Sequence, residues 1–499
     1  MFENYLNGFA MMADWGVLLA IASGTLLGIV VGVLPGLTSA MAVALLLPLT
    51  FGMPPVMGVG MLLGVLCGAC AGGAIPAVLL NIPGSPASVA TSLDGFPMAR
   101  KGEAGRALGL AIVSSFIGGM VSVAFLSLLA PPIAEFALRF GPAEYFSLSI
   151  FGLVIIASVA SGSILKGLVA GLLGLFAATV GMDPITGVPR FTFNELSLLT
   201  GINLLPALIG LFAVSQLIKD AMEYVQGQQA AQVASNAEQS MSRATPRWRE
   251  VFSNPRALLA GVGVGSIVGP IPGAGASIAS LVSYDQAKRL SRTPERFGTG
   301  HPEGIIATES SNNSMIGGAL IPTLALGVPG EAATAVLLGG LLIQGIAPGP
   351  ALFNDPSGMI YGIFIAYLLA NIFMLLIMWF GIRLFVRVLH VPRKLLLALI
   401  TTFCFLGVYG VAGDVFDIWL MLGFGFLGFF LNRYGFGTAP LILGLILGPI
   451  AEANLRRGLV TFGGDWTPFV TRPISVVFLG LALFLLLLTL WQNHKRTTA

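Results

Sequence analysis

Long apolar blocks without a charged side chain are the feature that most constrains how this 499-residue chain can fold. A helix needs about 20 apolar residues to cross the hydrocarbon core of a bilayer, and several blocks approach or reach that length: residues 15–34, 107–134, 145–165, 358–380 and 474–490. These runs are continuous and lack the strict alternation of a membrane β-barrel. Only 9% of the residues are charged, against about 25% in a soluble domain. We therefore expect an all-α polytopic membrane protein with roughly a dozen transmembrane segments.

Two motifs recur in the same order and indicate that the chain consists of two related halves. The sequence GVLPG at residues 32–36 returns as GPIPG at residues 269–273, an offset of 237 residues. The sequence IPAVLLNIPG at residues 75–84 returns as IPTLALGVPG at residues 321–330, an offset of 246 residues. The extra residues of the second half fit the polar loop at residues 291–304.

The polar stretch between the two halves sets the predicted domain boundaries. Residues 226–242 are rich in Gln, Ala and Ser and contain no apolar block, which is typical of a surface linker. We expect a first membrane repeat over residues 1–218, a polar linker over 219–255 and a second membrane repeat over 256–499.

Basic residues differ between matching loops of the two halves. The loop after the first Ile-Pro-Gly motif holds Arg100, Lys101 and Arg106, whereas its counterpart at residues 341–353 has no Lys or Arg. An earlier loop shows the reverse: residues 51–56 are uncharged, and their counterpart is basic at Lys288, Arg289, Arg292 and Arg296. Lys and Arg accumulate in cytoplasmic loops. We therefore predict an inverted-topology repeat with broken helices or re-entrant hairpins, as in many secondary transporters.

Four Pro-Gly pairs interrupt the apolar segments in symmetric positions, at residues 35–36, 83–84, 272–273 and 329–330. Lipid cannot satisfy the backbone groups that such breaks release, so they must pack inside protein or line a polar cavity. Small or polar residues follow each break and predict helix N-termini, whose free N–H groups attract anions. A packing kink is the simpler explanation of one break, but the paired recurrence favours a substrate site.

We predict that this site binds its substrate through residues at the breaks and through nearby amides. The predicted substrate-binding residues are Pro35, Gly36, Thr38, Ser39, Asn81, Gly84, Ser85, Ser88, Gly273, Gly275, Ser277, Asn312, Asn313, Gly330 and Thr334.

Other polar intrusions leave two interpretations open. The run Glu309 to Ser314 is either a ligand or ion site, since intramembrane polar groups are costly and often functional, or a polar helix cap at the membrane surface. Asp94 lies in a stretch that reads as a solvated loop, with a gate or docking surface as the alternative. Tyr284 and Asp285 fit a helix end at the membrane surface better than a coupling site, and Glu452 fits an ion pair with Arg456 or Arg457.

Several classes of function find little support. No Gly-Lys-Ser/Thr triplet of a P-loop occurs, so energy must come from an ion gradient or a partner. Cys67 and Cys70 read as small buried helix residues, and the three histidines are scattered. An intramembrane aspartyl protease would need a second Asp that faces Asp285 of the Tyr284-Asp285 pair. A non-transporting scaffold would not require symmetric broken helices. We expect no catalytic residues and no nucleic-acid partner.

Ordered motifs along nearly the whole chain resemble the large permease subunit of the tripartite tricarboxylate transporter family. They lie at residues 32–36, 81–84, 94–102, 269–275, 284–297, 312–330 and 448–454. The resemblance implies a multi-pass protein of the bacterial inner membrane that works with a small membrane subunit and a periplasmic substrate-binding protein. It also implies import of small carboxylates such as citrate, coupled to Na⁺ or another cation. We expect no other cofactor, and place a coupling Na⁺ near Ser310, Asn313 and Gly327.

Overall fold

The computed structural model describes residues 2–160, 163–183, 186–225, 245, 247–273, 275–355, 357–389 and 391–497. In this part of the chain, eight helices are long and apolar enough to cross a membrane, and six further apolar helices are shorter. Three of the short helices, over residues 39–50, 255–268 and 332–343, flank predicted breaks. The prediction of an all-α polytopic membrane protein is confirmed, and the breaks explain why some apolar segments are divided.

The helices form two compact units, residues 1–134 with 221–400, and residues 135–220 with 401–499. Each unit takes helices from both predicted repeats, so the spatial grouping does not follow the linker. The predicted domain boundaries at residues 219 and 255 stay predictions. The predicted inversion of one repeat relative to the other also stays a prediction. All predicted substrate-binding residues belong to the first unit.

The first unit contains the interrupted helices. Its elements are α1 (Phe2–Met12), α2 (Trp15–Val33), α3 (Ser39–Leu46), η1 (Leu47–Thr50), α4 (Pro55–Gly72), α5 (Ala74–Leu80), η2 (Pro86–Ser88), α6 (Val89–Met98), η3 (Ala99–Glu103), most of α7 (Ala104–Ala137), α12 (Trp248–Phe252), α13 (Pro255–Val268), α14 (Gly275–Leu290), η7 (Pro294–Arg296), α15 (Pro302–Leu326), α16 (Ala332–Ile343), η8 (Pro350–Asn354) and α17 (Met359–Val388).

The second unit is helical apart from one short hairpin. Its elements are α8 (Pro142–Ala160), α9 (Ile164–Ala177), β1 (Gly181–Met182), β2 (Pro189–Arg190), η4 (Leu196–Leu198), α10 (Leu204–Ile209), η5 (Gly210–Val214), α19 (Val415–Arg433), α20 (Ala439–Thr461), α21 (Thr467–Thr471) and α22 (Pro473–Thr497); α11 (Ser215–Val225) and α18 (Arg393–Ala412) cross between the units in sequence.

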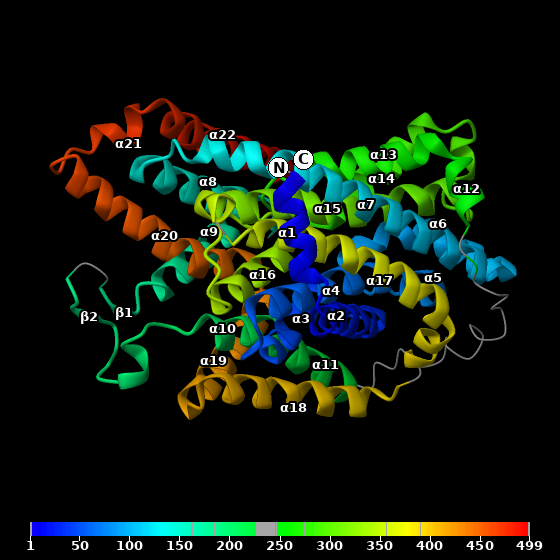
Figure 1. The fold of residues 1–499 in the computed structure, drawn as a ribbon, viewed down its shortest axis with the longest axis horizontal. Coiled ribbons are helices and arrows are strands. Elements are labelled where there is room, and N and C mark those ends of the chain that lie inside the picture. The colour runs from blue at the N-terminus through cyan, green and yellow to red at the C-terminus, as the bar shows by residue number, and fades with distance from the viewer. Residues whose placement is uncertain are drawn as a thin grey trace. The chain divides into compact units, whose positions relative to one another are not determined.

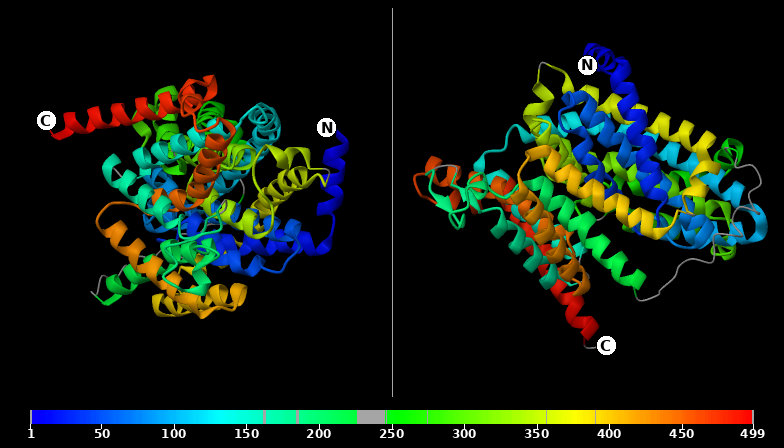
Figure 2. Two further views of the ribbon diagram at one scale, coloured as in Figure 1. Left: turned by 90° about the vertical axis from the view of Figure 1, so that its left-hand side faces the viewer. Right: turned by 90° about the horizontal axis from the view of Figure 1, so that it is seen from below.

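Glycine stripes bring two helix pairs of the first unit into backbone contact. Helix α2 packs on α4, and α13 packs on α15 (Figure 1). A Cβ atom on Gly28 would collide with the carbonyl oxygen of Val65, and one on Gly265 with that of Ser311. Glycines at four-residue spacing permit this approach, because only a missing side chain lets the backbones come this near. Helix α17 packs along both α2 and α4, and Figure 2 shows this group from two further sides.

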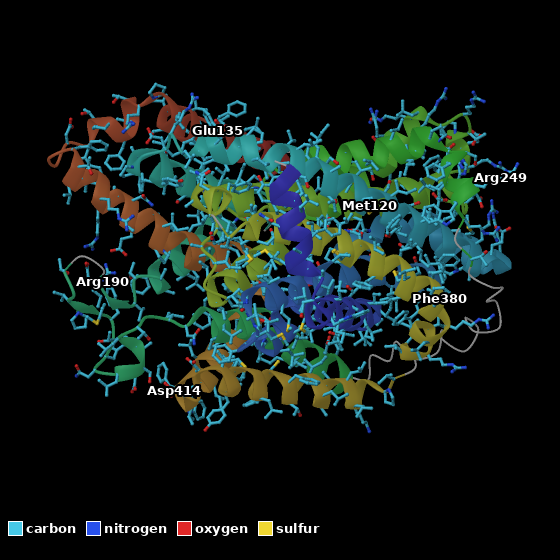
Figure 3. All side chains as sticks on the ribbon, in the orientation of Figure 1. Met120, Glu135, Arg190, Arg249, Phe380 and Asp414 are labelled. Atoms are coloured by element: carbon cyan, nitrogen blue, oxygen red, sulfur yellow. The ribbon has the colours of Figure 1, made fainter. Side chains whose placement is uncertain are left out.

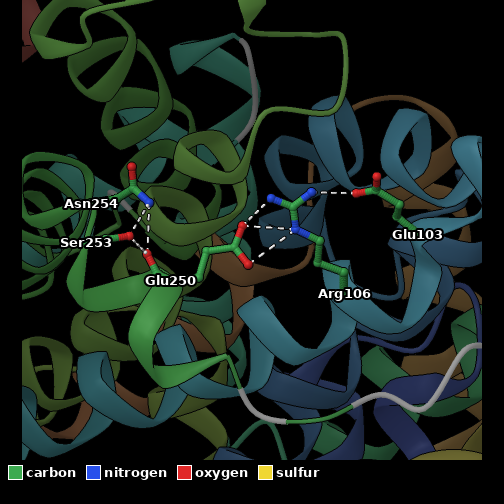
Figure 4. Close-up of polar contacts among 5 residues, drawn as sticks. All are labelled: Glu103, Arg106, Glu250, Ser253 and Asn254. Carbon is green, nitrogen blue, oxygen red and sulfur yellow. Dashed lines mark hydrogen bonds and ion pairs between the residues drawn. The ribbon is translucent and has the colours of Figure 1, made fainter.

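A charged cluster fixes the chain where it enters the second half (Figure 4). Arg106 on α7 donates through Nε to Glu250 on α12 at 2.9 Å and through Nη1 to Glu103 at 2.6 Å. Ser253 and Asn254 both donate to the Glu250 carbonyl oxygen at 2.8 Å. The predicted linker is therefore helical at its described ends, and the Gln-, Ala- and Ser-rich residues 226–242 lie outside the described part of the chain.

The hairpin of the second unit ends in a network of four charges. Gly181 pairs with Arg190 across the antiparallel strands, and Figure 3 labels Arg190 at this position. Its Nη1 lies 2.5 Å from Glu452 and 3.4 Å from Asp183. Arg456 completes the network at 2.9 Å from Glu452 and 2.6 Å from Asp183. The predicted ion pair of Glu452 with Arg456 is confirmed, and the hydrogen bond to Glu452 raises the pKa of Arg190.

Candidate functional site

All four predicted helix interruptions are present, and matching ones share their backbone conformation. Helix α2 stops before Gly36 (φ 89°) and α13 stops before Gly273 (φ 83°). Helix α5 ends at Asn81 (φ 56°) and α15 ends at Gly327 (φ 71°), both in the left-handed region. Because L-residues other than Asn and Asp seldom adopt this conformation, the sequence at each break explains why the helix ends there.

The hydrogen bonds at the second break of each half also match. The Ile82 N–H donates to the Pro76 carbonyl at 3.4 Å, and the Val328 N–H donates to the Pro322 carbonyl at 3.1 Å. These two bonds are related by the same 246-residue offset that the sequence motif shows. The repeat in the sequence is therefore also a repeat of local backbone structure.

The two breaks of each half touch one another through small residues. A Cβ atom on Gly84 would lie 2.5 Å from the carbonyl oxygen of Gly32, at the end of α2, and one on Gly330 would lie 2.9 Å from that of Gly269, just after α13. In the second half the Gly273 N–H donates to the Gly330 carbonyl at 2.7 Å. Such contacts leave no room for a side chain at Gly84 or Gly330.

The halves meet crosswise at these breaks. Helix α3 packs against α16, and η2 packs against α14, so each helix that follows a break contacts one that follows a break of the other half. The four interruptions consequently lie in one part of the first unit. Their gathering there is what an anion site built from several helix N-termini requires.

The predicted substrate-binding residues differ in exposure. Gly36 and Asn81 are exposed; the partly exposed ones are Pro35, Thr38, Ser39, Gly273, Gly275 and Ser277; the buried ones are Gly84, Ser85, Ser88, Asn312, Asn313, Gly330 and Thr334. Two of these hydroxyls already accept hydrogen bonds at the start of their own helices. Thr38 accepts from the Met41 N–H at 3.3 Å, and Thr334 accepts from the Glu331 N–H at 3.0 Å. Ser85 and Ser88 bond to each other at 3.1 Å.

Glu331 is a residue of this region that sequence reasoning did not single out. Its Oε2 accepts from the Ala276 N–H, at the start of α14, at 3.4 Å. Its Oε1 is buried and has no hydrogen-bond partner among the described residues. The N-terminus of α14 is therefore faced by a carboxylate of the protein itself, which corrects the expectation of bare N–H donors there. The available signal was that Glu331 follows Pro-Gly where the first half has Ser85.

The polar run Glu309 to Ser314 lies within α15 and is buried throughout. The alternative of a polar cap at the membrane surface is therefore wrong, because α15 begins seven residues earlier, at Pro302. The Asn312 amide donates to the Cys70 carbonyl at 3.3 Å, and the Asn313 amide donates to the Glu309 carbonyl at 3.2 Å. The Oδ1 atoms of both asparagines are buried without a partner among the described residues.

The residues predicted for Na⁺ are placed around the same helix. Ser310 donates its hydroxyl to the Ile306 carbonyl of its own helix at 2.7 Å, Asn313 keeps a free Oδ1, and Gly327 ends the helix. Cys67 and Cys70 are buried free thiols on α4, as the helix-packing interpretation predicts. His390 lies outside the described residues.

Asp94 is buried on α6, so the prediction of a solvated loop is wrong. Its Oδ1 accepts from the N–H groups of Gly298, Gly300 and His301 at 2.9, 2.8 and 2.7 Å. Its Oδ2 accepts from the Tyr284 hydroxyl at 2.9 Å. Asp94 thus holds the loop between α14 and α15 against α6. The donors lie far along the chain, so no local pattern revealed this role.

Comparison with known proteins identifies the family. A 52.8 kDa protein from Agrobacterium vitis, described as uncharacterized, is 38% identical over 95% of this chain and 93% of its own length. A second uncharacterized protein of that organism is 37% identical over 46% of this chain and 96% of its own length. No solved structure matches. The model of the Tripartite tricarboxylate transporter TctA family matches residues 18–443. Together with the symmetric helix breaks, this match shows that the chain belongs to that family, whose members are subunits of bacterial membrane transporters.

Proposed function

We propose that the chain is the permease subunit of a secondary transporter that imports small carboxylates, a tricarboxylate such as citrate first among them. Transport is coupled to a Na⁺ or H⁺ gradient across the bacterial inner membrane. A small membrane subunit completes the permease, and a periplasmic binding protein delivers the substrate. Family membership supports this proposal, and the gathering of the four helix breaks in one part of the first unit is the observation that carries it.

Helix N-termini supply the chemistry for an anion. The helices α3, α14 and α16 all begin directly after a break. Each N-terminus carries about half a positive charge and N–H groups that have no partner in the helix. A substrate with several carboxylates can accept hydrogen bonds from more than one of them, with the hydroxyls of Ser39 and Ser85 close to the breaks.

Glu331 gives a physical reason for coupling to a cation. While it is ionised, its charge beside the N-terminus of α14 opposes the approach of an anionic substrate. A cation that travels with the substrate lowers this repulsion. Transport of the anion without the cation would then be slow, which is the behaviour of a symporter.

The enzyme alternative has no comparable support. Asp285 lies on the exposed end of α14 and pairs with Arg289 at 2.8 Å. The carboxylate of Asp94 is occupied by backbone N–H groups and by Tyr284. The two aspartates therefore do not form the facing pair that an aspartyl protease needs.

Uptake into proteoliposomes tests the proposal. The permease is reconstituted with its small membrane subunit and binding protein, and accumulation of labelled di- and tricarboxylates is measured under an imposed Na⁺ or pH gradient. We expect gradient-dependent accumulation, and a reduction of about fivefold in Ser85→Ala, since a hydrogen bond to a bound ligand contributes about 1 kcal/mol.

Ser23→Ala is the matched control, because Ser23 is exposed and, among the described residues, its hydroxyl bonds only to the Ala20 carbonyl of its own helix. Absence of gradient-dependent accumulation for every carboxylate would refute the proposal. Equal uptake by wild type, Ser85→Ala and Asn313→Ala would refute the predicted binding site but not the proposed transport activity.

A further inference from the structure

Glu309 is a fully buried carboxylate at the contact of three helices. Its side chain on α15 is 0% exposed. Its Oε1 accepts from the Thr91 hydroxyl of α6 at 2.5 Å, and its Oε2 accepts from the Ser115 hydroxyl of α7 at 2.9 Å. Two neutral hydroxyls are its only side-chain donors among the described residues, and no described Lys, Arg or His forms an ion pair with it.

Asp94, on the same helix α6 as Thr91, is a buried carboxylate whose charge is compensated by hydrogen-bond donors. It lies one turn beyond Thr91 on α6 and has four donors, three of them backbone N–H groups. Glu309 has half as many, and both are hydroxyls. Burial of an unpaired charge costs several kcal/mol. Glu309 therefore needs a positive charge or a proton that none of the described residues supplies.

Further oxygen atoms lie close to the partners of the carboxylate. The Thr91 hydroxyl also lies 3.1 Å from the Thr308 hydroxyl. One turn along α15, the Asn313 amide donates to the Glu309 carbonyl at 3.2 Å, which leaves its buried Oδ1 without a partner. An excess of oxygen acceptors over donors is the environment that a proton or a hard monovalent cation fills.

No basic group on the neighbouring helices is available to Glu309. Arg106 on α7 is bound by Glu103 and Glu250, and Arg256 on α13 donates to the Leu290 carbonyl at 3.4 Å. On α14, Arg289 pairs with Asp285 at 2.8 Å, and Lys288 is exposed at the same end of the helix. His301, just before α15, bonds to the Thr293 hydroxyl at 3.0 Å. The acidic and weakly acidic groups around α15 are Cys67, Cys70, Asp94, Tyr284, Asp285, Glu303, Glu331 and Tyr367.

We propose that Glu309, with the hydroxyls of Thr91 and Ser115, is the site at which a monovalent cation, H⁺ or Na⁺, binds to this subunit. The site deepens the proposed function, because it names the residues that couple transport to the cation. Thr91 lies six residues after Ser85, on the helix that follows a break of the first half. A cation at Glu309 would hold α6 against α15 and so connect cation binding to the helix N-termini.

Thermal unfolding of the purified full-length subunit without substrate tests the site. The midpoint is measured against Na⁺ concentration at constant ionic strength with choline as the replacement ion, and separately against pH in choline alone. We expect a midpoint that rises with Na⁺, or with falling pH, in the wild type, and a Glu309→Gln variant that has lost this response. If the cation is Na⁺, Ser115→Ala removes a nearby oxygen ligand and should raise the half-saturating concentration about tenfold. If it is H⁺, the same change removes a donor to the ionised carboxylate and should move the pH response to higher pH.

Glu103→Gln is the matched control, because Glu103 is a partly exposed carboxylate of the same unit, paired with Arg106. A response to Na⁺ that needs Glu309 identifies a sodium site, and a response to pH alone that needs Glu309 identifies a proton site. Identical responses of wild type and Glu309→Gln to both would overturn the proposal. Should Glu309→Gln fail to fold, Ser115→Ala and Thr91→Ala decide in the same way.

Cation binding is measured here in the absence of any carboxylate. Its loss therefore counts against the cation site alone, whereas absent uptake with intact cation binding counts against the proposed transport function alone.

Discussion

Helices α4 and α15 occupy equivalent places in the two halves, yet they differ in the chemistry that they carry. Each packs through glycines on the helix that precedes the first break of its half, α2 or α13, and each leads toward a Pro-Gly break. The polar run at residues 309–314 of α15 corresponds, at an offset of 246 residues, to Leu-Gly-Val-Leu-Cys-Gly at residues 63–68 of α4. The same asymmetry continues beyond the break, where Glu331 corresponds to Ser85.

The comparison shows that the backbone conformation repeats in the two halves, whereas the buried carboxylates do not. The backbone of both halves repeats the same interruptions, left-handed residues and glycine contacts. Buried carboxylates at α15 and at the following break occur in the second half only, among these equivalent positions. Two similar frameworks can thus supply helix N-termini, while one of them also supplies the acidic groups for a cation.

The largest effect is expected where the two halves are alike. Gly28→Ala and Gly265→Ala each place a methyl group against a backbone carbonyl of the neighbouring helix. Overpacking of this kind should lower the free energy of unfolding by about 3 kcal/mol, measured as a fall in the thermal midpoint of the purified protein. Gly263→Ala on α13 is the control, since nothing lies within 4 Å of the added atom. Equal midpoints for the Gly263 and Gly265 variants would contradict the proposed backbone contact.

An intermediate effect is expected where the halves differ in charge. Glu331→Gln removes the negative charge that opposes the anion at the N-terminus of α14, so we expect uptake without a cation gradient to rise by about 30-fold, equivalent to about 2 kcal/mol, and uptake to depend less on the cation gradient. Ser85→Ala, at the equivalent position, should lower uptake only about fivefold and leave its dependence on the cation gradient unchanged. Proteoliposome uptake measures both. The charge asymmetry would have no role if both variants lost uptake equally and responded equally to the cation.

The smallest effect concerns the two left-handed helix ends. Gly327→Ala should cost about 1 kcal/mol, because alanine resists this conformation, whereas its Cβ would only touch the Pro348 carbonyl at 3.5 Å. Asn81→Gly should change stability by a few tenths of a kcal/mol, since both residues tolerate a positive φ. Chemical denaturation in detergent gives both values. A larger loss in Asn81→Gly than in Gly327→Ala would show that side-chain contacts, and not the backbone, decide these positions.

Local patterns were enough for the elements of the fold. Apolar length predicts the spanning helices, and the Pro-Gly pairs predict where helices stop. These signals succeed because the bilayer forces every backbone group to be satisfied nearby in the chain. The repeat of two motifs then predicts that the same local structure occurs twice, as the paired hydrogen bonds show.

The partners of the buried acids were not predictable in this way. The sequence around Asp94 predicts a loop, because nothing near it in the chain indicates a partner. Its hydrogen-bond donors lie at Gly298 to His301, more than 200 residues away. Glu309 reads as part of a polar run, but its hydroxyl partner Thr91 is 218 positions distant. Glu331 follows a Pro-Gly pair, and only the approach of α14 shows that its carboxylate occupies a helix N-terminus.

The sequence by itself determined the membrane class, the helix interruptions and the internal repeat, since each depends on the composition of about 20 neighbouring residues or fewer. Only the tertiary structure decided which helix ends meet and which buried carboxylates lack compensating donors. A hydrogen bond requires atoms within about 3 Å of each other, and that proximity is set by how distant segments pack, not by their order along the chain.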